Sequence, residues 1–94
     1  MATPAQIAND MAAHAAYWAK RDREIERVCR DAARVIRALM AGEPVDGRTY
    51  GGLHMRLLER ERRRPDWHPD WHVQGYPDFD RARLCMERLR REAG

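Results

Sequence analysis

The sequence contains no serine, so the aliphatic hydroxyls that could act as nucleophiles are those of Thr3 and Thr49. Neither threonine lies beside a histidine or another obvious base in the sequence, and a hydroxyl nucleophile needs such a base. Glycine-rich phosphate loops are lacking as well, because Gly47, Gly51 and Gly52 match neither the P-loop nor the dinucleotide-binding spacing. We therefore expect a protein that is not an enzyme, with no catalytic residue and no cofactor.

Cysteine is scarce. Cys29 and Cys85 are far apart and form no Cys-x-x-Cys motif, which argues against a disulfide scaffold and against a zinc knuckle. Both cysteines fall on the apolar faces of predicted helices, where a thiol is expected to be buried. A reactive thiol should be partly exposed, so we do not expect either cysteine to act as a nucleophile with a histidine.

Long hydrophobic runs are also missing. Nothing in the chain approaches the roughly 18 consecutive apolar residues that a membrane-spanning helix requires, and no apolar run of signal-peptide length follows Met1. These absences predict a cytoplasmic protein that does not associate with a membrane.

Glycine and proline do not occur between Pro4 and Gly42, and this stretch is the strongest structural signal in the sequence. Thr3 is a suitable N-cap with Pro4 at the first helical position, and Gly42 provides the stop. Apolar residues recur at helical spacing within a stripe about 140° wide. These features predict one helix over residues 4–41, about 55 Å long at 1.5 Å per residue. Arg21 and Asp22 interrupt the stripe, and the alternative is a bend near residue 21.

The remainder of the chain predicts two shorter helices, at about residues 50–64 and 79–93, separated by an ordered loop at 65–77. Pro65 ends the first of them, and Asp78 caps the second. The loop is rich in tryptophan, histidine and proline. We therefore predict an all-α fold, with residues 1–94 forming a single helical domain.

The mismatch in helix length predicts self-association. The two shorter helices would reach only about 21–23 Å each, so about half of the apolar stripe on the long helix would be left uncovered. A homodimer through Met11, His14, Trp18 and Ile25 would cover it. If the first helix instead folds back near residue 21, it closes its own core.

Lysine occurs once, and the remaining basic side chains are arginines. Residues 48–64 hold six arginines and two glutamates, a surplus of four positive charges in a chain whose net charge is +3. Arg56, Arg60 and Arg63 share one face of the second predicted helix, and Trp67 and Trp71 follow in the adjacent loop. This combination predicts a partner-binding surface for an acidic protein or, as basic and aromatic groups together also suggest, for nucleic acid.

The loop repeats the tetrapeptide Pro-Asp-Trp-His, which places His68 and His72 four residues apart. Such a pair binds zinc when both histidines share a helix face, but Pro69 lies between them and opposes a regular helix. We interpret the repeat as two turns whose tryptophans cover the core, and we predict no metal.

The function indicated by these features is binding to a protein partner, as an adaptor, regulator or inhibitor. The alanines around Tyr17 and Trp18 support this interpretation, because small residues let two helices approach closely. The alternative is a nucleic-acid-binding protein that uses the arginine face of the second predicted helix. By its size and charge, the chain also suits a phage-type inhibitor of a nucleic-acid enzyme, such as an anti-CRISPR protein.

Overall fold

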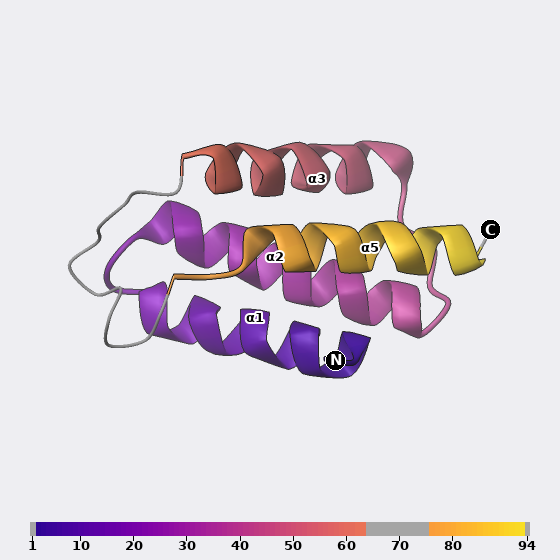
Figure 1. Cartoon of the computed structure of the whole chain (residues 1–94), viewed down its shortest axis with the longest axis horizontal. Coiled ribbons are helices and arrows are strands. Elements are labelled where there is room, and N and C mark those ends of the chain that lie inside the picture. The colour runs from indigo at the N-terminus through magenta and orange to yellow at the C-terminus, as the bar shows by residue number, and fades with distance from the viewer. Residues whose placement is uncertain (1, 64–75, 94) are drawn as a thin grey trace.

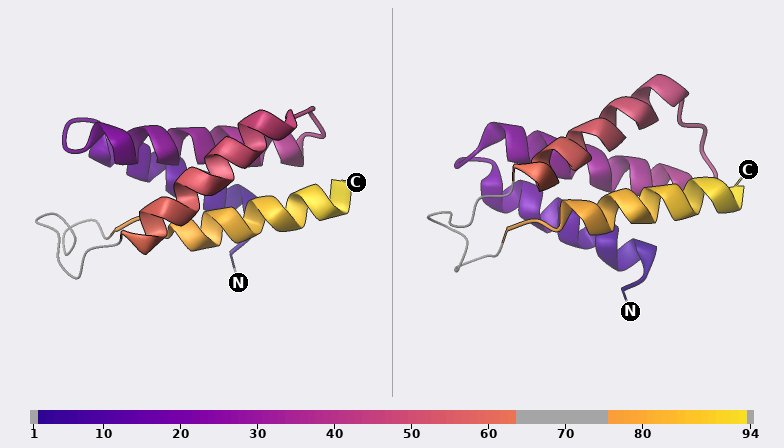
Figure 2. Two further views of the ribbon diagram at one scale, coloured as in Figure 1. Left: turned by 90° about the horizontal axis from the view of Figure 1, so that it is seen from above. Right: turned by 45° about the horizontal axis from the view of Figure 1, so that its top comes forward.

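The protein is all-α in a computed structural model that describes residues 2–63 and 76–93. Within these ranges there are four helices and no strand: α1 (Pro4–Trp18), α2 (Arg23–Met40), α3 (Gly47–Arg62) and α5 (Phe79–Ala93). In Figure 1, α2 lies behind α5, with α1 and α3 on either side, and α2 packs against all three of the other helices. Figure 2 shows that α3 crosses α2 and α5 obliquely. The longest dimension of the molecule is 40 Å.

All four helices of the described ranges begin at a side-chain cap, and at α5 the carboxylate of Asp78 accepts the amide of Arg81 at 2.9 Å. Thr3 and Gln6 form a capping box at the start of α1, with hydrogen bonds of 2.8 and 3.2 Å to each other's backbone amides. The carboxylate of Asp22 accepts the amides of Glu24 and Ile25 at the start of α2, and that of Asp46 accepts the amide of Thr49 at 2.7 Å. Because Asp46 is the N-cap, helix α3 begins at Gly47, three residues before the predicted start. The prediction was late because the glycines of this segment are typical of a loop.

The prediction of one long helix over residues 4–41 is wrong, because the chain folds back between Trp18 and Arg23. Asp22 has an extended backbone, with φ −147° and ψ 104°, which helical geometry does not allow. Arg21 donates from Nη1 to the carbonyl oxygen of Tyr17 at 2.6 Å, and its guanidinium lies 4.0 Å from the centre of the Tyr17 ring. The turn is therefore made by a basic residue that caps α1 and an acidic residue that caps α2, without glycine or proline.

This turn closes the core within a single chain. Helices α1 and α2 form an antiparallel hairpin whose apolar faces meet each other and α5. Trp18 packs edge-to-face on Tyr17 and Tyr76, with ring centroids 5.4 and 5.8 Å apart, and Tyr76 packs in the same way on Phe79. No buried residue in the described ranges is polar or charged. The core is thin but fully apolar.

The hairpin removes the reason for expecting a homodimer through an uncovered stripe. Met11, Trp18 and Ile25 are at most 1% exposed, buried against residues of their own chain. His14 is half-buried. The stripe is covered by the chain itself, so these residues do not form the exposed self-association surface that the sequence suggests. No helix in the described part of the chain is long and apolar enough to cross a membrane.

Candidate protein-binding surface

The arginines of α3 that the sequence singles out are engaged in ion pairs. Arg56 pairs with Asp31 of α2 at 3.0 Å, and Arg60 pairs with Glu24 of α2. Arg63 pairs with Glu59 on its own helix at 3.3 Å. The Arg60 side chain is only 14% exposed. Two of these arginines therefore hold α3 against α2, and the face is not the open basic stripe that the sequence suggests. Trp67 and Trp71 lie outside the described residues.

A second arginine row, on α2, was missed in the sequence. Its members are spaced four, three, four and three residues apart, so they share one helix face opposite the buried one. They are Arg23, Arg27, Arg30, Arg34 and Arg37, and all are exposed. We call them the α2 arginine row. It spans about 21 Å along the helix. The spacing of these arginines could have been found in the sequence. It was overlooked because residues 1–47 have a net charge of zero, which gives no indication of a basic surface.

A groove of about 690 Å³ lies beside this row, between α1 and α2. Alanines from both helices and from the turn between them make up most of its lining, namely Ala12, Ala15, Ala16, Ala19, Ala33 and Ala38. Three members of the α2 arginine row and two glutamates complete it, namely Arg30, Arg34, Arg37, Glu26 and Glu43. We call this the α1/α2 groove. Alanine side chains leave the groove open, since they end at Cβ.

The arginines of the α1/α2 groove are positioned by neighbouring polar groups. Arg30 pairs with Glu26 at 3.2 Å, Arg34 pairs with Asp31 at 3.1 Å, and Arg37 donates to the Asn9 side chain of α1 at 3.0 Å. The side chains of Arg30 and Arg34 are nevertheless 61% and 71% exposed. Such exposed pairs contribute little stability, so their guanidinium groups can still bind a carboxylate from outside.

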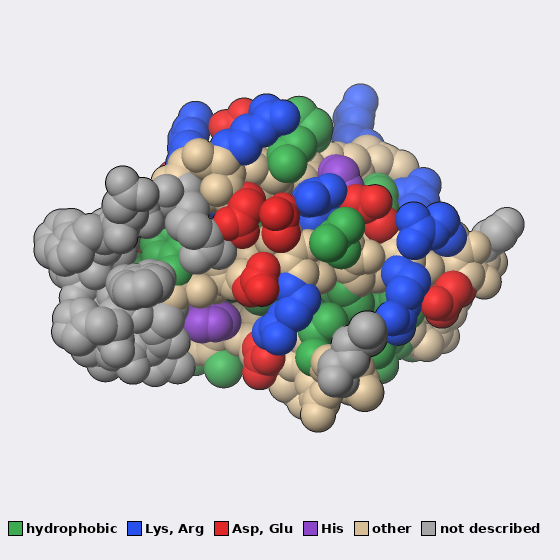
Figure 3. All heavy atoms as spheres, viewed as in Figure 1, with side chains coloured by type: hydrophobic (Ala, Val, Ile, Leu, Met, Phe, Trp, Pro, Cys, Tyr) green, Lys and Arg blue, Asp and Glu red, His purple; other side chains and the backbone are tan. Residues whose placement is uncertain are grey.

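The opposite face of the molecule has a balanced charge. Figure 3 shows basic and acidic side chains alternating over α5 and α3. The carboxylate of Glu87 accepts from His54 at 3.0 Å and from Arg83 at 2.9 Å, and Arg83 also pairs with Asp80 at 3.1 Å. The hydrogen bond from His54 is the main cause that lowers the pKa of Glu87. The contact of His54 with Glu87 joins α3 to α5, the pairs of Arg83 lie within α5, and we assign them all a structural role.

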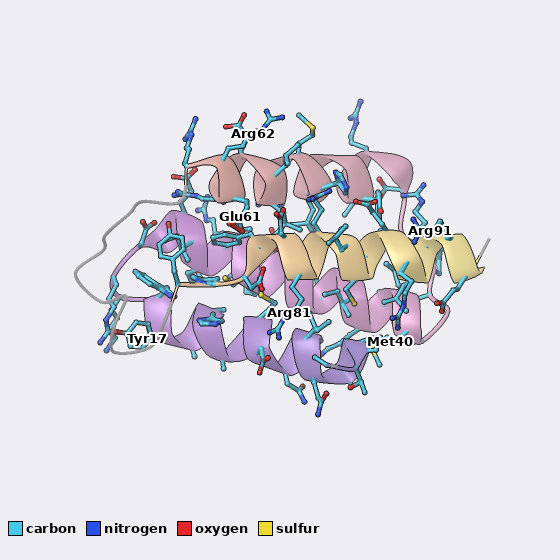
Figure 4. The ribbon with its side chains drawn as sticks, viewed as in Figure 1. Tyr17, Met40, Glu61, Arg62, Arg81 and Arg91 are labelled. Carbon is cyan, nitrogen blue, oxygen red and sulfur yellow. The ribbon has the colours of Figure 1, made fainter. Side chains whose placement is uncertain are left out.

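Burial is the main cause of the pKa shifts of three other described side chains, those of Cys29, Cys85 and His14. Burial raises the pKa of the Cys29 thiol to about 12, which keeps it protonated at neutral pH, and burial raises the pKa of Cys85 as well. Burial lowers the pKa of His14, which lies near the 2.8 Å ion pair of Asp10 with Arg81. Figure 4 shows Arg81 on the side of α5 that faces α1. Among the described residues, no three potential metal ligands gather at one point.

Comparisons with protein families, with curated proteins and with solved structures gave no match to this chain. The α1/α2 groove and the α2 arginine row are therefore the features from which a function can be inferred.

Proposed function

We propose that this protein acts by binding another protein, without chemistry of its own, and that the α1/α2 groove is its binding surface. The observation that carries the proposal is an alanine-lined groove with Arg30, Arg34 and Arg37 along one side. The alanine lining is suited to contact with apolar side chains of a partner, and the arginines favour a partner segment that carries negative charge.

The partner segment that fits this surface is an amphipathic helix with small apolar residues on one face and acidic residues at its edge. Small side chains in the groove let a third helix approach at the 8–10 Å axial distance typical of packed helices. The guanidinium group of arginine is a planar fork that binds a carboxylate through two parallel hydrogen bonds. Carboxylates three or four residues apart on the partner would match Arg30, Arg34 and Arg37, which have the same spacing.

The α2 arginine row is also the observation that favours the alternative, binding to nucleic acid. Two features support a protein instead. Glu26 and Glu43 lie in the α1/α2 groove, where they would repel a continuous row of phosphates, whereas a partner helix can place its few carboxylates beside the arginines alone. Burying the alanine side chains against an apolar helix face is favourable, because it removes apolar surface from water. A hydrated phosphate backbone would not bury this surface. Arg60 is a poor candidate for phosphate contacts, because its paired side chain is only 14% exposed.

Site-specific photocrosslinking in cells of the source organism tests the proposal. A photoreactive phenylalanine at the exposed position Ala16 would lie in the groove, and the same group at Met55 on α3 is the matched control position. We expect a protein adduct from position 16 that is absent from position 55. Mass spectrometry of the adduct would identify the partner, and a nucleic-acid enzyme in that place, if its activity falls when this chain is added, would indicate an inhibitor of the phage type.

Charge reversal distinguishes the groove from the rest of the surface. Arg34→Glu with Arg37→Glu should reduce the adduct at least tenfold, which is about 1.4 kcal/mol of binding free energy. The control, Arg62→Glu with Arg91→Glu, has the same change in net charge, and Figure 4 shows Arg62 pointing away from the bundle and Arg91 on α5. An adduct that survives the groove variant would contradict the proposal.

The nucleic-acid alternative has its own signature. Random single- and double-stranded oligonucleotides should not bind the wild type with micromolar affinity at physiological salt. If they did, the logarithm of the affinity would fall with the logarithm of the salt concentration by about 0.7–0.9 for each phosphate neutralised. That result, or an adduct at position 16 that nuclease removes, would replace protein binding with nucleic-acid binding.

A further inference from the structure

The turn between α1 and α2 is built from residues that also suit a helix. Residues 19–22 are Ala, Lys, Arg and Asp, and the first three are among the best helix formers. Ala19 already has helical backbone angles, φ −54° and ψ −34°. No residue other than glycine has a positive φ in the described part of the chain. The Asp22 side chain favours the extended backbone at this position, because it caps α2. No residue of the turn, however, is prevented from adopting a helical backbone.

The turn and a continuous helix satisfy the same backbone groups in different ways. In the hairpin, Asp22 Oδ1 accepts the amides of Glu24 and Ile25 at 3.1 and 3.2 Å, and Arg21 covers the Tyr17 carbonyl. In a continuous helix, these amides would bond to the carbonyls four residues earlier, and the Tyr17 carbonyl would accept the Arg21 amide. Removal of the caps therefore need not leave a polar backbone group without a partner.

The hairpin geometry also allows α1 to be exchanged between two molecules. Helix α1 packs on α2 and α5, and its buried residues are Ile7, Ala8, Met11, Ala15 and Trp18. If the turn straightens, these residues leave their own α2 and become exposed, while an empty place of the same shape opens on α2 and α5. Because α1 and α2 are antiparallel, two straightened chains can lie antiparallel, with α1 of each in the empty place of the other.

We propose that this chain forms a domain-swapped homodimer, in which residues 4–40 become one continuous helix and α1 packs on α2 and α5 of a second copy. The packing of Met11, Trp18 and Ile25 is preserved but becomes intermolecular. The contacts of α1 are the same in both states, so the equilibrium is set by the turn and by protein concentration. This inference is independent of the proposed function, because the α1/α2 groove is rebuilt between the two chains.

Two opposite changes in the turn test the proposal by sedimentation equilibrium at roughly 100 μM, far above a micromolar dissociation constant. Arg21→Ala with Asp22→Ala removes both caps and should shift the equilibrium at least tenfold toward a species of twice the 11.0 kDa chain mass. Ala19→Gly with Lys20→Gly leaves both caps in place but disfavours the continuous helix, and should shift it at least tenfold toward the monomer. The wild type should lie between them, with a dimer fraction that rises with concentration.

A distance across the turn separates the swapped dimer from any other dimer. Asn9 and Arg37 are joined by a 3.0 Å hydrogen bond in the hairpin and are 28 residues apart in sequence, so a continuous helix would separate them by about 42 Å. Spin labels at Asn9→Cys and Arg37→Cys, measured in dimers diluted with unlabelled chains, should give this long distance. Labelling of the buried Cys29 and Cys85 is checked in a wild-type sample.

Two results would overturn the proposal. One is a mass of 11.0 kDa at this concentration for the wild type and both variants, and the other is a dimer that shows only the short distance. If the variant without caps does not fold, as judged by the loss of a cooperative thermal transition, the wild type and the diglycine variant decide alone. Equal dimer fractions in those two proteins would then refute the exchange of α1.

Discussion

Substitution of Trp18 by alanine tests the packing of the apolar core, because this side chain is among the largest that the fold buries completely. In the hairpin Trp18 is 0% exposed and packs on Tyr17 and Tyr76 in the core of one chain. Truncation of a buried aromatic side chain to alanine typically costs about 3–5 kcal/mol, because the transfer free energy is lost and a cavity remains. A domain of this length has a stability of roughly 5–14 kcal/mol. The substitution should therefore remove a large part of the total.

The assay is thermal and urea unfolding followed by far-ultraviolet circular dichroism, which does not depend on tryptophan. A loss of this size should lower the melting temperature by roughly 12–40 °C, at about 4–8 °C per kcal/mol for a domain of 60–100 residues. Leu84→Ala is the control, since this apolar side chain on α5 is 54% exposed, and its truncation should change the stability by no more than about 0.5 kcal/mol. If Trp18→Ala leaves the free energy of unfolding unchanged, Trp18 does not lie in the apolar core and the packing described above is refuted.

Two further predictions concern pH and thiol chemistry. Because the hydrogen bond from His54 lowers the pKa of Glu87 below its ordinary value of 4.5, this carboxylate contributes stability above that pH, and the contribution is lost as the pH falls through the lowered pKa. Glu87→Gln should therefore reduce stability at neutral pH and flatten its decline in acid, as measured by urea unfolding at several pH values; an unchanged pH profile would contradict this. The Cys29 thiol, with a pKa of about 12, should resist alkylation by iodoacetamide at mildly alkaline pH until the protein is denatured, as mass spectrometry would show, and rapid labelling of native protein would contradict its burial.

Some features of the candidate site could be predicted from the sequence, whereas others depend on the tertiary structure. The α2 arginine row is a simple periodicity in residues 23–37 and could have been found by examining each helix face separately. The ion pairs of Arg56 with Asp31 and of Arg60 with Glu24 could not, because these partners are 25 or more residues apart and meet only when α3 crosses α2. The groove also depends on the hairpin, since its alanines come from two helices.

The sequence by itself determined the start of α1, the end of α2, both ends of α5 and which helix faces are apolar. Thr3, Gly42 and Asp78 act through local hydrogen bonds and backbone preferences, which a short stretch of chain contains in full. Only the tertiary structure decided that residues 4–41 form two helices. Ala19, Lys20 and Arg21 suit a helix as well as they suit the turn, so local preference does not choose between the two. The choice depends on burying the apolar face of α1 against α2 and α5, and that burial depends on contacts between residues distant in the sequence.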